Sequence, residues 1–354
     1  MSEPLRDKLK PNERLRAYAK EEAVDRLPCV PIVGNTAARV IGARVGEFKG
    51  NGKLVARAQV AAYRMFGYDN IRIFTDLYTI AEAMGAAVFY PDDETAYLDS
   101  PAINDEKDIA SLKPADPQKD GNLPQFLEAM KIALDEVGDE VPVTGALTGP
   151  FTTSSFLIGA ERLARGIITS PEAVHELCSV ALESCLNYAK AIIDIGCTPS
   201  LTDPMSSGTV ISRKQFQTFS FPYLKKLIDY IHGRGKGVTL HICGNTSKIW
   251  DLMADAGADC LSIDNEASLA DAKRAVGDRV RLMGNVRPSE IMLEGTQADV
   301  NQAVRRCVTE AHDSPKGLVV ASGCSLPTET PFENIRAMLN AVREIGWPVN
   351  TGRG

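Results

Sequence analysis

The chain has 354 residues, 44% of them hydrophobic and 24% charged, which is the composition of an ordinary globular protein with one large domain or two smaller ones. Its 39 basic and 46 acidic side chains give a formal net charge of −7, which argues against nucleic acid as a partner because such binding usually needs a basic face. No apolar stretch reaches the ~18 residues of a transmembrane helix, so we expect no membrane partner.

The first part of the chain predicts an N-terminal helical extension over residues 1–25, ahead of the first strand. Residues 1–20 are charged and lack the apolar core of a secretory signal, so a cytoplasmic location is the default expectation. The eight cysteines are therefore expected to be reduced thiols rather than disulfides.

Short apolar runs alternate with amphipathic stretches along the chain, which is typical of βα units around a parallel sheet. Strands are expected at residues 29–33, 71–74, 141–147, 199–202, 237–242, 260–263, 280–283 and 318–321. Eight strands with intervening helices indicate an α/β fold, a single (β/α)₈ TIM barrel domain spanning residues 1–354. A doubly wound open sheet is the competing fold, although no Gly-x-Gly-x-x-Gly turn follows the first strand.

Several helices have clear start signals. Ser170 precedes a proline, which places an N-cap serine before a proline at the first helical position. Ser212 and Gln215 have the spacing of a capping box, and Thr330 precedes the last helix in the same way. Residues 92–122 are polar and contain prolines, so we expect them to form a surface insertion.

Metal-binding residue types stand at the ends of two predicted strands. His241 and Cys243 are two residues apart, and side chains with this spacing on a strand point to the same side. The strand at 318–321 brings Cys324 to the same rim of the barrel. One imidazole and two thiolates make a zinc site with an open fourth position, which is typical of catalysis. The alternative is core packing, because free cysteine most often behaves as a small buried hydrophobe.

Other polar residues also follow the predicted strands, where barrel enzymes place their chemistry. These residues are Asp76, Thr152, Asp203, Asp264, Glu266 and Asn285. We expect Asp76, Thr152, Asp203 and Asn285 to line the cofactor-binding cavity, and Asp76 also to take part in catalysis. A carboxylate, Asp264 or Glu266, is a hypothesis for the open metal position. Asp76 fits a helix N-cap equally well, and Asp203, before a proline, also fits a turn.

The chain resembles the uroporphyrinogen decarboxylase superfamily along nearly all its length. The landmarks are Phe74-Thr75-Asp76-Leu77, Leu147-Thr148-Gly149-Pro150-Phe151-Thr152, Met283-Gly284-Asn285-Val286 and Thr330-Pro331-Phe332-Glu333-Asn334. The family fold is a (β/α)₈ barrel. Decarboxylases of this family carry an arginine-rich loop after the first strand to bind substrate carboxylates, whereas residues 34–38 here read Gly-Asn-Thr-Ala-Ala. They also carry Gly-His-Gly near the last strand, where this chain has Gly-Cys-Ser at 323–325.

The zinc branch of the superfamily is the better match, because its methylcobamide:coenzyme M methyltransferases carry His-x-Cys and a distant Cys as zinc ligands. By this resemblance the ligands are His241, Cys243 and Cys324. The resemblance implies a zinc-dependent methyltransferase of one-carbon metabolism that moves a methyl group from a methylated corrinoid (methylcobamide) to coenzyme M, another thiol or a pterin. None of the four histidines lies in an Asp-x-His-x-x-Gly corrinoid motif, so a partner corrinoid protein is expected to present the cobalamin.

Other functions stay open at this point. One is a metal-free porphyrinogen decarboxylase, and another is a non-catalytic accessory factor of a corrinoid protein. Zinc-dependent hydrolysis is a third, but it needs a general base beside the metal, and two thiolates make zinc a weaker Lewis acid.

Overall fold

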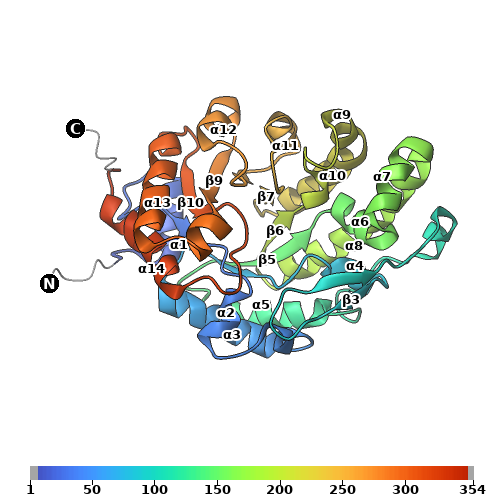
Figure 1. Ribbon diagram of the computed structural model, residues 1–354, viewed down its shortest axis with the longest axis horizontal. Helices are drawn as coiled ribbons and strands as arrows, with labels where there is room; N and C mark the ends of the chain where they lie inside the picture. The colour runs from blue at the N-terminus through green and yellow to red at the C-terminus, as the bar shows by residue number, and fades with distance from the viewer. Residues whose placement is uncertain (1–6, 350–354) are drawn as a thin grey trace.

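The structure is a computed structural model that describes residues 7–349. Within this range one curled sheet contains eight parallel strands, and Figure 1 shows helices around its outside. The strands are β1 (Cys29–Val30), β2 (Ile71–Ile73), β5 (Val143–Thr148), β6 (Thr198–Thr202), β7 (Thr239–His241), β8 (Cys260–Ser262), β9 (Arg281–Val286) and β10 (Leu318–Ser322). The strand order is β1-β10-β9-β8-β7-β6-β5-β2, so the first strand pairs with the last. The predicted (β/α)₈ barrel is confirmed, and the open-sheet alternative is wrong.

A ring of helices surrounds the sheet. Its members are α3 (Gly52–Phe66), α5 (Leu123–Val137), α8 (Pro171–Asp194), α10 (Phe221–Gly233), α11 (Trp250–Asp255), α12 (Leu269–Val276), α13 (Gln297–Ala311) and α14 (Phe332–Ile345). Each helix contacts the next, and α14 contacts α3, which closes the ring. No helix in the described part of the chain is long and apolar enough to cross a membrane.

The remaining helical elements are mostly short and fall before or between the strands and ring helices along the chain. They are α1 (Pro11–Ala19), α2 (Thr36–Val40), η1 (Val45–Phe48), α4 (Thr79–Ala83), η2 (Glu106–Ser111), α6 (Pro150–Ile158), α7 (Ala160–Thr169), η3 (Pro204–Ser206), α9 (Arg213–Gln215), η4 (Phe216–Ser220) and η5 (Pro288–Leu293). Helix α1 lies in the predicted N-terminal extension. The predicted insertion at 92–122 contains β4 (Tyr97–Ser100), which pairs with β3 (Ala87–Phe89) in a separate hairpin.

The predicted helix starts differ in their capping. The capping box of Ser212 and Gln215 is confirmed, with each residue bonding to the backbone N–H of the other. Ser170 stands at the N-cap of α8, but its side chain makes no capping bond. The capping expected of Thr330 is wrong, because its hydroxyl donates to the Pro327 carbonyl and α14 begins only after Pro331.

The edges of the sheet, β1 and β2, meet at the N-terminal end of the barrel through Asp69. Its backbone N–H donates to the Cys29 carbonyl at 2.9 Å, and its carboxylate accepts from the Cys29 N–H at 2.7 Å. Arg14 and Arg26 each bind one oxygen of the same carboxylate, at 2.5 and 2.6 Å. Helix α1 and the segment before β1 are therefore tied to the base of the barrel by ion pairs.

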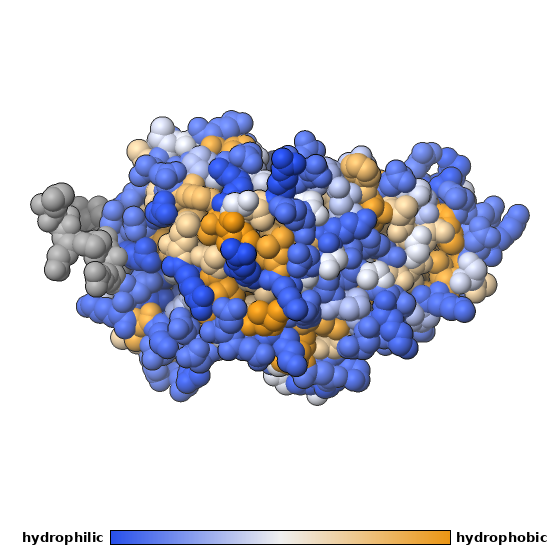
Figure 2. Space-filling model, turned by 90° about the horizontal axis from the view of Figure 1, so that it is seen from below, coloured by the Kyte–Doolittle hydropathy of each residue, from blue (hydrophilic) through white to orange (hydrophobic). Residues whose placement is uncertain are grey.

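The two faces of the sheet differ in polarity. Residues that point outward toward the helices, such as Ile71, Leu201 and Leu240, are apolar and fully buried. Residues that point inward include Arg72, Thr144 and Ser200, where most barrels of this class have bulky branched side chains. Small polar residues leave space in the middle of the barrel. Figure 2 shows one outer face, where hydrophobic residues gather toward the centre with hydrophilic residues around them.

Candidate metal centre

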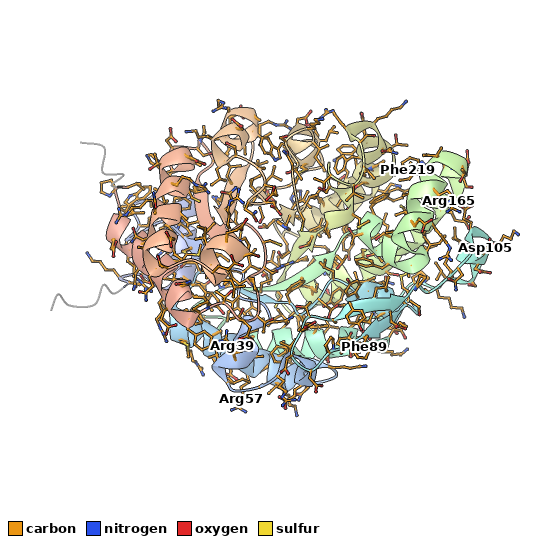
Figure 3. All side chains as sticks on the ribbon, in the orientation of Figure 1. Arg39, Arg57, Phe89, Asp105, Arg165 and Phe219 are labelled. Carbon is orange, nitrogen blue, oxygen red and sulfur yellow. The ribbon has the colours of Figure 1, made fainter. Side chains whose placement is uncertain are left out.

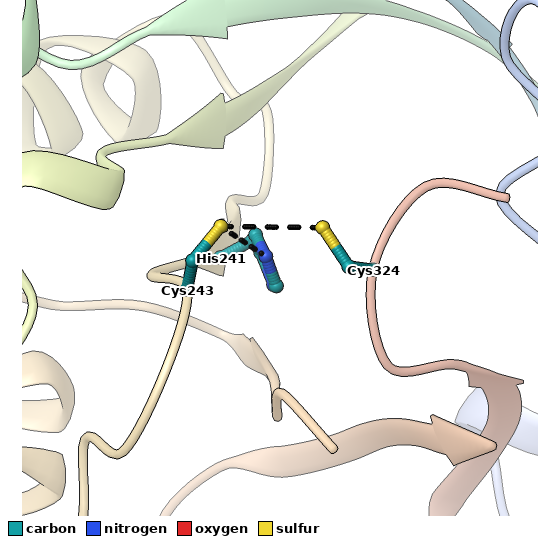
Figure 4. Close-up of side chains that lie close together, drawn as sticks. All are labelled: His241, Cys243 and Cys324. Atoms are coloured by element: carbon teal, nitrogen blue, oxygen red, sulfur yellow. Dashed lines mark hydrogen bonds between the residues drawn. The ribbon is translucent and has the colours of Figure 1, made fainter. Parts of the chain in front are cut away.

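The ends of β7 and β10 bring three metal-binding side chains together at the C-terminal mouth of the barrel. His241 is the last residue of β7, Cys243 lies two residues beyond it, and Cys324 lies two residues beyond β10. Figure 4 shows the three side chains together, with dashed lines from the Cys243 sulfur to His241 and to the Cys324 sulfur. It lies 3.2 Å from His241 Nε2 and 4.0 Å from Cys324 Sγ. The structure thus brings together all three residues that the sequence predicted to meet.

The spacing of these donor atoms suits a tetrahedral metal ion. Their ligand atoms all lie within 4.8 Å of one another. Zn–S bonds of about 2.3 Å and Zn–N bonds of about 2.0 Å place tetrahedral ligands roughly 3.5–3.8 Å apart. The two contacts of the Cys243 sulfur, 3.2 Å to His241 Nε2 and 4.0 Å to Cys324 Sγ, lie within a few tenths of an ångström of this range. A disulfide is excluded, because it needs sulfurs about 2.05 Å apart.

The orientation of His241 prepares it as a ligand. Its Nδ1 lies 3.1 Å from the carbonyl oxygen of Ser262 and 3.1 Å from the Ser262 hydroxyl, on the neighbouring strand β8. A carbonyl only accepts hydrogen bonds, so Nδ1 carries the proton. Nε2 then has its lone pair free and directed at the two sulfurs. Such an outer contact fixes the tautomer and ring orientation of metal-binding histidines.

The two thiols differ in acidity because they lie side by side. A hydrogen bond from the Cys243 thiol, with help from His241, outweighs burial and lowers the pKa of Cys324. The same contact, together with burial, raises the pKa of Cys243. Cys324 is therefore the more acidic of the two thiols, and a divalent cation between the sulfurs would stabilise both as thiolates.

A glycine lets Cys324 reach the site. A Cβ atom on Gly323 would lie 2.6 Å from the backbone nitrogen of Asn265, a distance that real Cβ atoms do not show. The chain leaving β10 therefore passes directly against the loop after β8. Any larger residue at this position would push Cys324 away from His241.

The three ligands stand over a cavity of about 380 Å³ that runs through the inside of the barrel. We call it the barrel cavity. Its wall includes His241, Cys243, Cys324, Arg72, Phe74, Thr144, Ser200, Thr202, Thr239, Cys260, Ser262, Arg281 and Met283. Cys260 lies at its opposite end, at the start of β8, as the sequence predicted. The centre is thus reached by small molecules and is not sealed in packed core.

No carboxylate joins the three ligands among residues 7–349. Asp264 is buried, and one of its oxygens accepts the N–H of Glu266. The Glu266 carboxylate is exposed and lies near Arg287 and Asn265. A role for Asp264 or Glu266 at the open metal position therefore stays a hypothesis.

Asp76 lies outside the wall of the barrel cavity. It borders a separate small cavity of about 10 Å³, together with Asn35 and Gln125. Its carboxylate accepts hydrogen bonds from Thr75, from the Tyr78 N–H and from Thr79. Burial raises its pKa against these hydrogen bonds. The helix N-cap expected of Asp76 is wrong, because α4 begins at Thr79 with Tyr78 at its N-cap. Asp76 binds the turn ahead of that helix instead, and a catalytic role stays a prediction.

Three further predicted residues form buried hydrogen-bond networks beside the mouth. Asp203 accepts from the Thr152 N–H and the Ser206 hydroxyl, which joins the loops after β5 and β6. Asn285 was predicted to follow its strand, but β9 extends to Val286, so Asn285 lies inside it. Its amide donates to the carbonyls of Asp264 and Ala267 and holds the loop after β8. Of these three, none borders the barrel cavity, so their cofactor contacts stay predictions.

Sequence reasoning missed two features of this site, Arg72 and Ser262. Arg72 donates from Nη2 to Thr202 Oγ1 at 2.6 Å inside the barrel cavity. Its signal was available, because the alternation Ile71-Arg72-Ile73 puts a charge on the inner face of a strand. Ser262 had no such signal, since its contact with His241 depends on the β7–β8 register.

Comparison with known proteins places this geometry in context. A family model described as uroporphyrinogen decarboxylase (URO-D) matches residues 10–345. The methylcobamide:CoM methyltransferase MtaA of Methanosarcina barkeri is 27% identical over 333 residues, covering 93% of this chain and 96% of the relative. The uroporphyrinogen decarboxylase of Pseudoalteromonas translucida is 29% identical over 321 residues, covering 86% and 88%. A solved methyltransferase from Methanosarcina mazei superposes with a TM-score of 0.86 at 28% identity, covering 95% and 99%.

Proposed function

The chain belongs to the uroporphyrinogen decarboxylase family, and within it we propose that the protein is a zinc-dependent methyltransferase that moves a methyl group from a methylated corrinoid to a thiol. The observation that carries the proposal is the cluster of His241, Cys243 and Cys324 at the mouth of the barrel. Relatives named methylcobamide:CoM methyltransferases, similar over almost their whole length, support the same reaction.

The residues of the chain have distinct roles in this proposal. His241, Cys243 and Cys324 hold the zinc ion, and Ser262 keeps the His241 ring turned toward it. Zinc, when bound, supplies a positive centre that lowers the pKa of an acceptor thiol and positions it as a thiolate. The barrel cavity beneath the cluster gives the rest of the acceptor a place out of bulk water.

The reaction needs only the acceptor thiolate and the methylated corrinoid, with no further oxidant or reductant. The acceptor thiolate forms a sulfur–carbon bond with the methyl group as the cobalt–carbon bond breaks. The electron pair of that bond stays on the corrinoid, which changes from methyl-cobalt(III) to cobalt(I). Holding the two reactants in line converts an encounter of two molecules into a step within one complex, which is a large part of the rate gain.

The corrinoid is proposed to come from a partner protein. A cavity of about 380 Å³ suits a small thiol, whereas a corrinoid is far larger and must approach from the mouth. The proposal therefore has a corrinoid protein docked over the C-terminal rim. Relatives named after methylcobamide as substrate support this arrangement.

Decarboxylation of a porphyrinogen is the second candidate, because relatives with that name match almost equally well. The segment after β1 does not favour it. Ala37 and Ala38 are fully buried, and Arg39 on α2 donates to the carbonyls of Thr328 and Thr330 (Figure 3). Arg44 pairs with the exposed Asp92. None of these residues borders the barrel cavity, so they do not provide a clamp for substrate carboxylates there.

The test begins with the metal content of the purified protein and its activity toward free methylcobalamin. We expect about one zinc per chain and transfer of the methyl group to a small thiol. Removal of the metal by a chelator should abolish transfer, and added zinc should restore it. Decarboxylation of uroporphyrinogen by the metal-free protein, with no methyl transfer by the zinc-loaded protein, would establish the second candidate instead.

A further inference from the structure

Arg72 is a buried cation whose binding capacity is only partly used. It lies in the wall of the barrel cavity, on the inner face of β2. Among residues 7–349 its guanidinium makes one hydrogen bond, from Nη2 to Thr202 Oγ1, and its Nε is buried without a partner. Its guanidinium carbon lies 4.6 Å from the centre of the Phe74 ring. A guanidinium offers five donors, so most of its capacity is free.

No carboxylate neutralises Arg72 within salt-bridge distance in the described part of the chain. The acidic residues that border the barrel cavity are occupied elsewhere. Asp69 binds Arg14 and Arg26, and Asp259 binds His232 and the Val238 N–H. A buried unpaired charge is costly, so a fold retains one where an anion arrives to pair with it.

The other arginine in the wall, Arg281, is arranged differently. Its Nε donates to the Lys316 carbonyl, and its guanidinium lies over the Tyr18 ring at 5.6 Å. It begins β9, at the N-terminal end of the strands. The two arginines make the barrel cavity cationic, but only Arg72 reaches the residues beside the metal centre.

The strand register sets Arg72 next to that centre. Thr202, which accepts its hydrogen bond, pairs with His241, and His241 pairs with Ser262. Cys243 and Cys324 border the same cavity as Arg72, beside its hydrogen-bond partner Thr202. A small molecule whose sulfur lies at the metal centre therefore has the guanidinium within reach of its other end.

We propose that Arg72 is a specificity-determining residue that binds an anionic group, a carboxylate or a sulfonate, on the tail of the methyl acceptor. This inference rests on the proposed methyltransferase function. The acceptor lies with its thiol at the metal centre and its tail inside the barrel cavity. The planar guanidinium of Arg72 can donate two parallel hydrogen bonds to two oxygens of one anion. The mouth stays open for the methyl donor, so the methyl group reaches the acceptor sulfur from the side opposite the acceptor's tail.

The experiment compares thiols of similar length and different charge on the zinc-loaded enzyme with free methylcobalamin. The thiols are 2-mercaptoethanesulfonate, 3-mercaptopropionate and neutral 2-mercaptoethanol, and the first two distinguish sulfonate from carboxylate. We expect wild type to prefer an anionic thiol. In Arg72→Gln, kcat/KM for that thiol should fall about 10- to 100-fold, mainly through KM, and the value for 2-mercaptoethanol should stay within about threefold.

A second measurement is independent of activity and of the metal. Metal-free protein is titrated calorimetrically with propane-1-sulfonate and with butyrate, which carry the anionic group but no thiol. Wild type should bind at least one of them, and Arg72→Gln should bind neither. Arg281→Gln is the matched control, since it removes the other arginine of the barrel cavity and should leave both binding and thiol preference unchanged.

Three outcomes would overturn the inference. Equal loss for charged and neutral thiols in Arg72→Gln would show that Arg72 acts on the metal centre and not on the tail. Anion binding that disappears in Arg281→Gln and persists in Arg72→Gln would place the site at the other end of the cavity. Anion binding by wild type with no transfer to any thiol would refute the methyltransferase function, and with it the assignment of the anion to the acceptor.

Discussion

The two ends of the barrel treat buried charge in opposite ways. At the N-terminal end, Asp69 is fully buried and both of its oxygens bind arginines, Arg14 and Arg26. Toward the mouth, Arg72 has a single hydrogen bond and no paired carboxylate among residues 7–349, and two cysteine sulfurs lie 4.0 Å apart. The base is satisfied by the chain itself. At the mouth, hydrogen-bond donors and metal-binding side chains lack protein partners, which is typical of a site that binds other molecules.

This difference separates stability from function within one sheet. Removing one member of a satisfied buried network leaves its partners unpaired, so the loss appears in the free energy of unfolding. Removing a group from the mouth leaves few protein partners stranded, so the loss appears in binding and catalysis. The comparison therefore predicts that the two regions respond to substitution in different measurements.

The largest effect is expected from Cys324→Ser. Three to four ligands share roughly 10–16 kcal/mol of zinc binding, so one ligand accounts for about 3–4 kcal/mol, or about 100- to 1,000-fold in affinity. Elemental analysis should show that the variant loses most of its zinc, and methyl transfer should fall to background. The urea midpoint of the metal-free protein should hardly change, because the sulfur is only partly buried.

Cys260→Ser is the matched control, since its thiol lies at the other end of the same cavity. Burial raises the pKa of Cys260 to about 12, so it is a neutral thiol and not a ligand. This variant should keep its zinc and its activity. Full zinc occupancy in Cys324→Ser would contradict the assignment of the metal centre.

Asp69→Asn should produce the largest loss of stability. It leaves two buried arginines without their shared carboxylate, which costs about 3–5 kcal/mol. The measurement is the free energy of unfolding from urea titration, with zinc content measured on the folded protein and expected to be unchanged. The control is Asp139→Asn, whose exposed pair with Lys10 at 3.5 Å should contribute less than about 1 kcal/mol. Similar losses in the two variants would contradict the comparison.

The sequence was sufficient for the features that depend on local periodicity. Every strand of the barrel was predicted within a few residues, because apolar runs and turn residues are local signals. The spacing of His241 and Cys243 predicted that these two side chains lie together, since side chains two apart share a strand face. Cys324 joins them only because distant strands pair in the sheet. The residues alone predicted that Cys324 follows a strand, but not which strands lie beside that one.

Features that depend on register and on loop paths were not predictable from the residues alone. The contact of Ser262 with His241 arises only once β8 lies beside β7. Asp76 and Asn285 were expected to line the cofactor cavity because they lie near strand ends, and in the structure neither borders the barrel cavity. Both side chains form hydrogen bonds with nearby backbone, and their cofactor contacts stay predictions. A position near a strand end therefore predicts the rim of the barrel, and the hydrogen-bond partners decide which side chains face the substrate.

Acid should weaken the base of the barrel before the rest of the fold. Burial alone raises the pKa of Asp25, but hydrogen bonds from Arg14 and from the Leu9 N–H outweigh it and lower that pKa to about 2. Because the folded pKa lies below the unfolded one, this contribution is fully present above about pH 4 and is lost as the pH falls to 2. The free energy of unfolding, measured by urea titration at pH 5 and at pH 2.5, should fall by about 1–2 kcal/mol less in Asp25→Asn than in wild type.

The smallest expected effect is also the sharpest test, because its sign differs between the two regions. Desolvation lowers the pKa of Arg72 to about 10, although the two nearby cysteines act in the opposite direction, so its burial as a cation has a cost. Arg72→Met keeps an unbranched apolar stem and removes the unpaired charge, and it should leave stability unchanged or raise it by about 1 kcal/mol. Arg14→Met, by contrast, strands Asp25 and Asp69 and should lose about 3–5 kcal/mol. Equal destabilisation by both substitutions would mean that Arg72 supports the fold as the basal arginines do, and its unpaired donors would then need an explanation other than ligand binding.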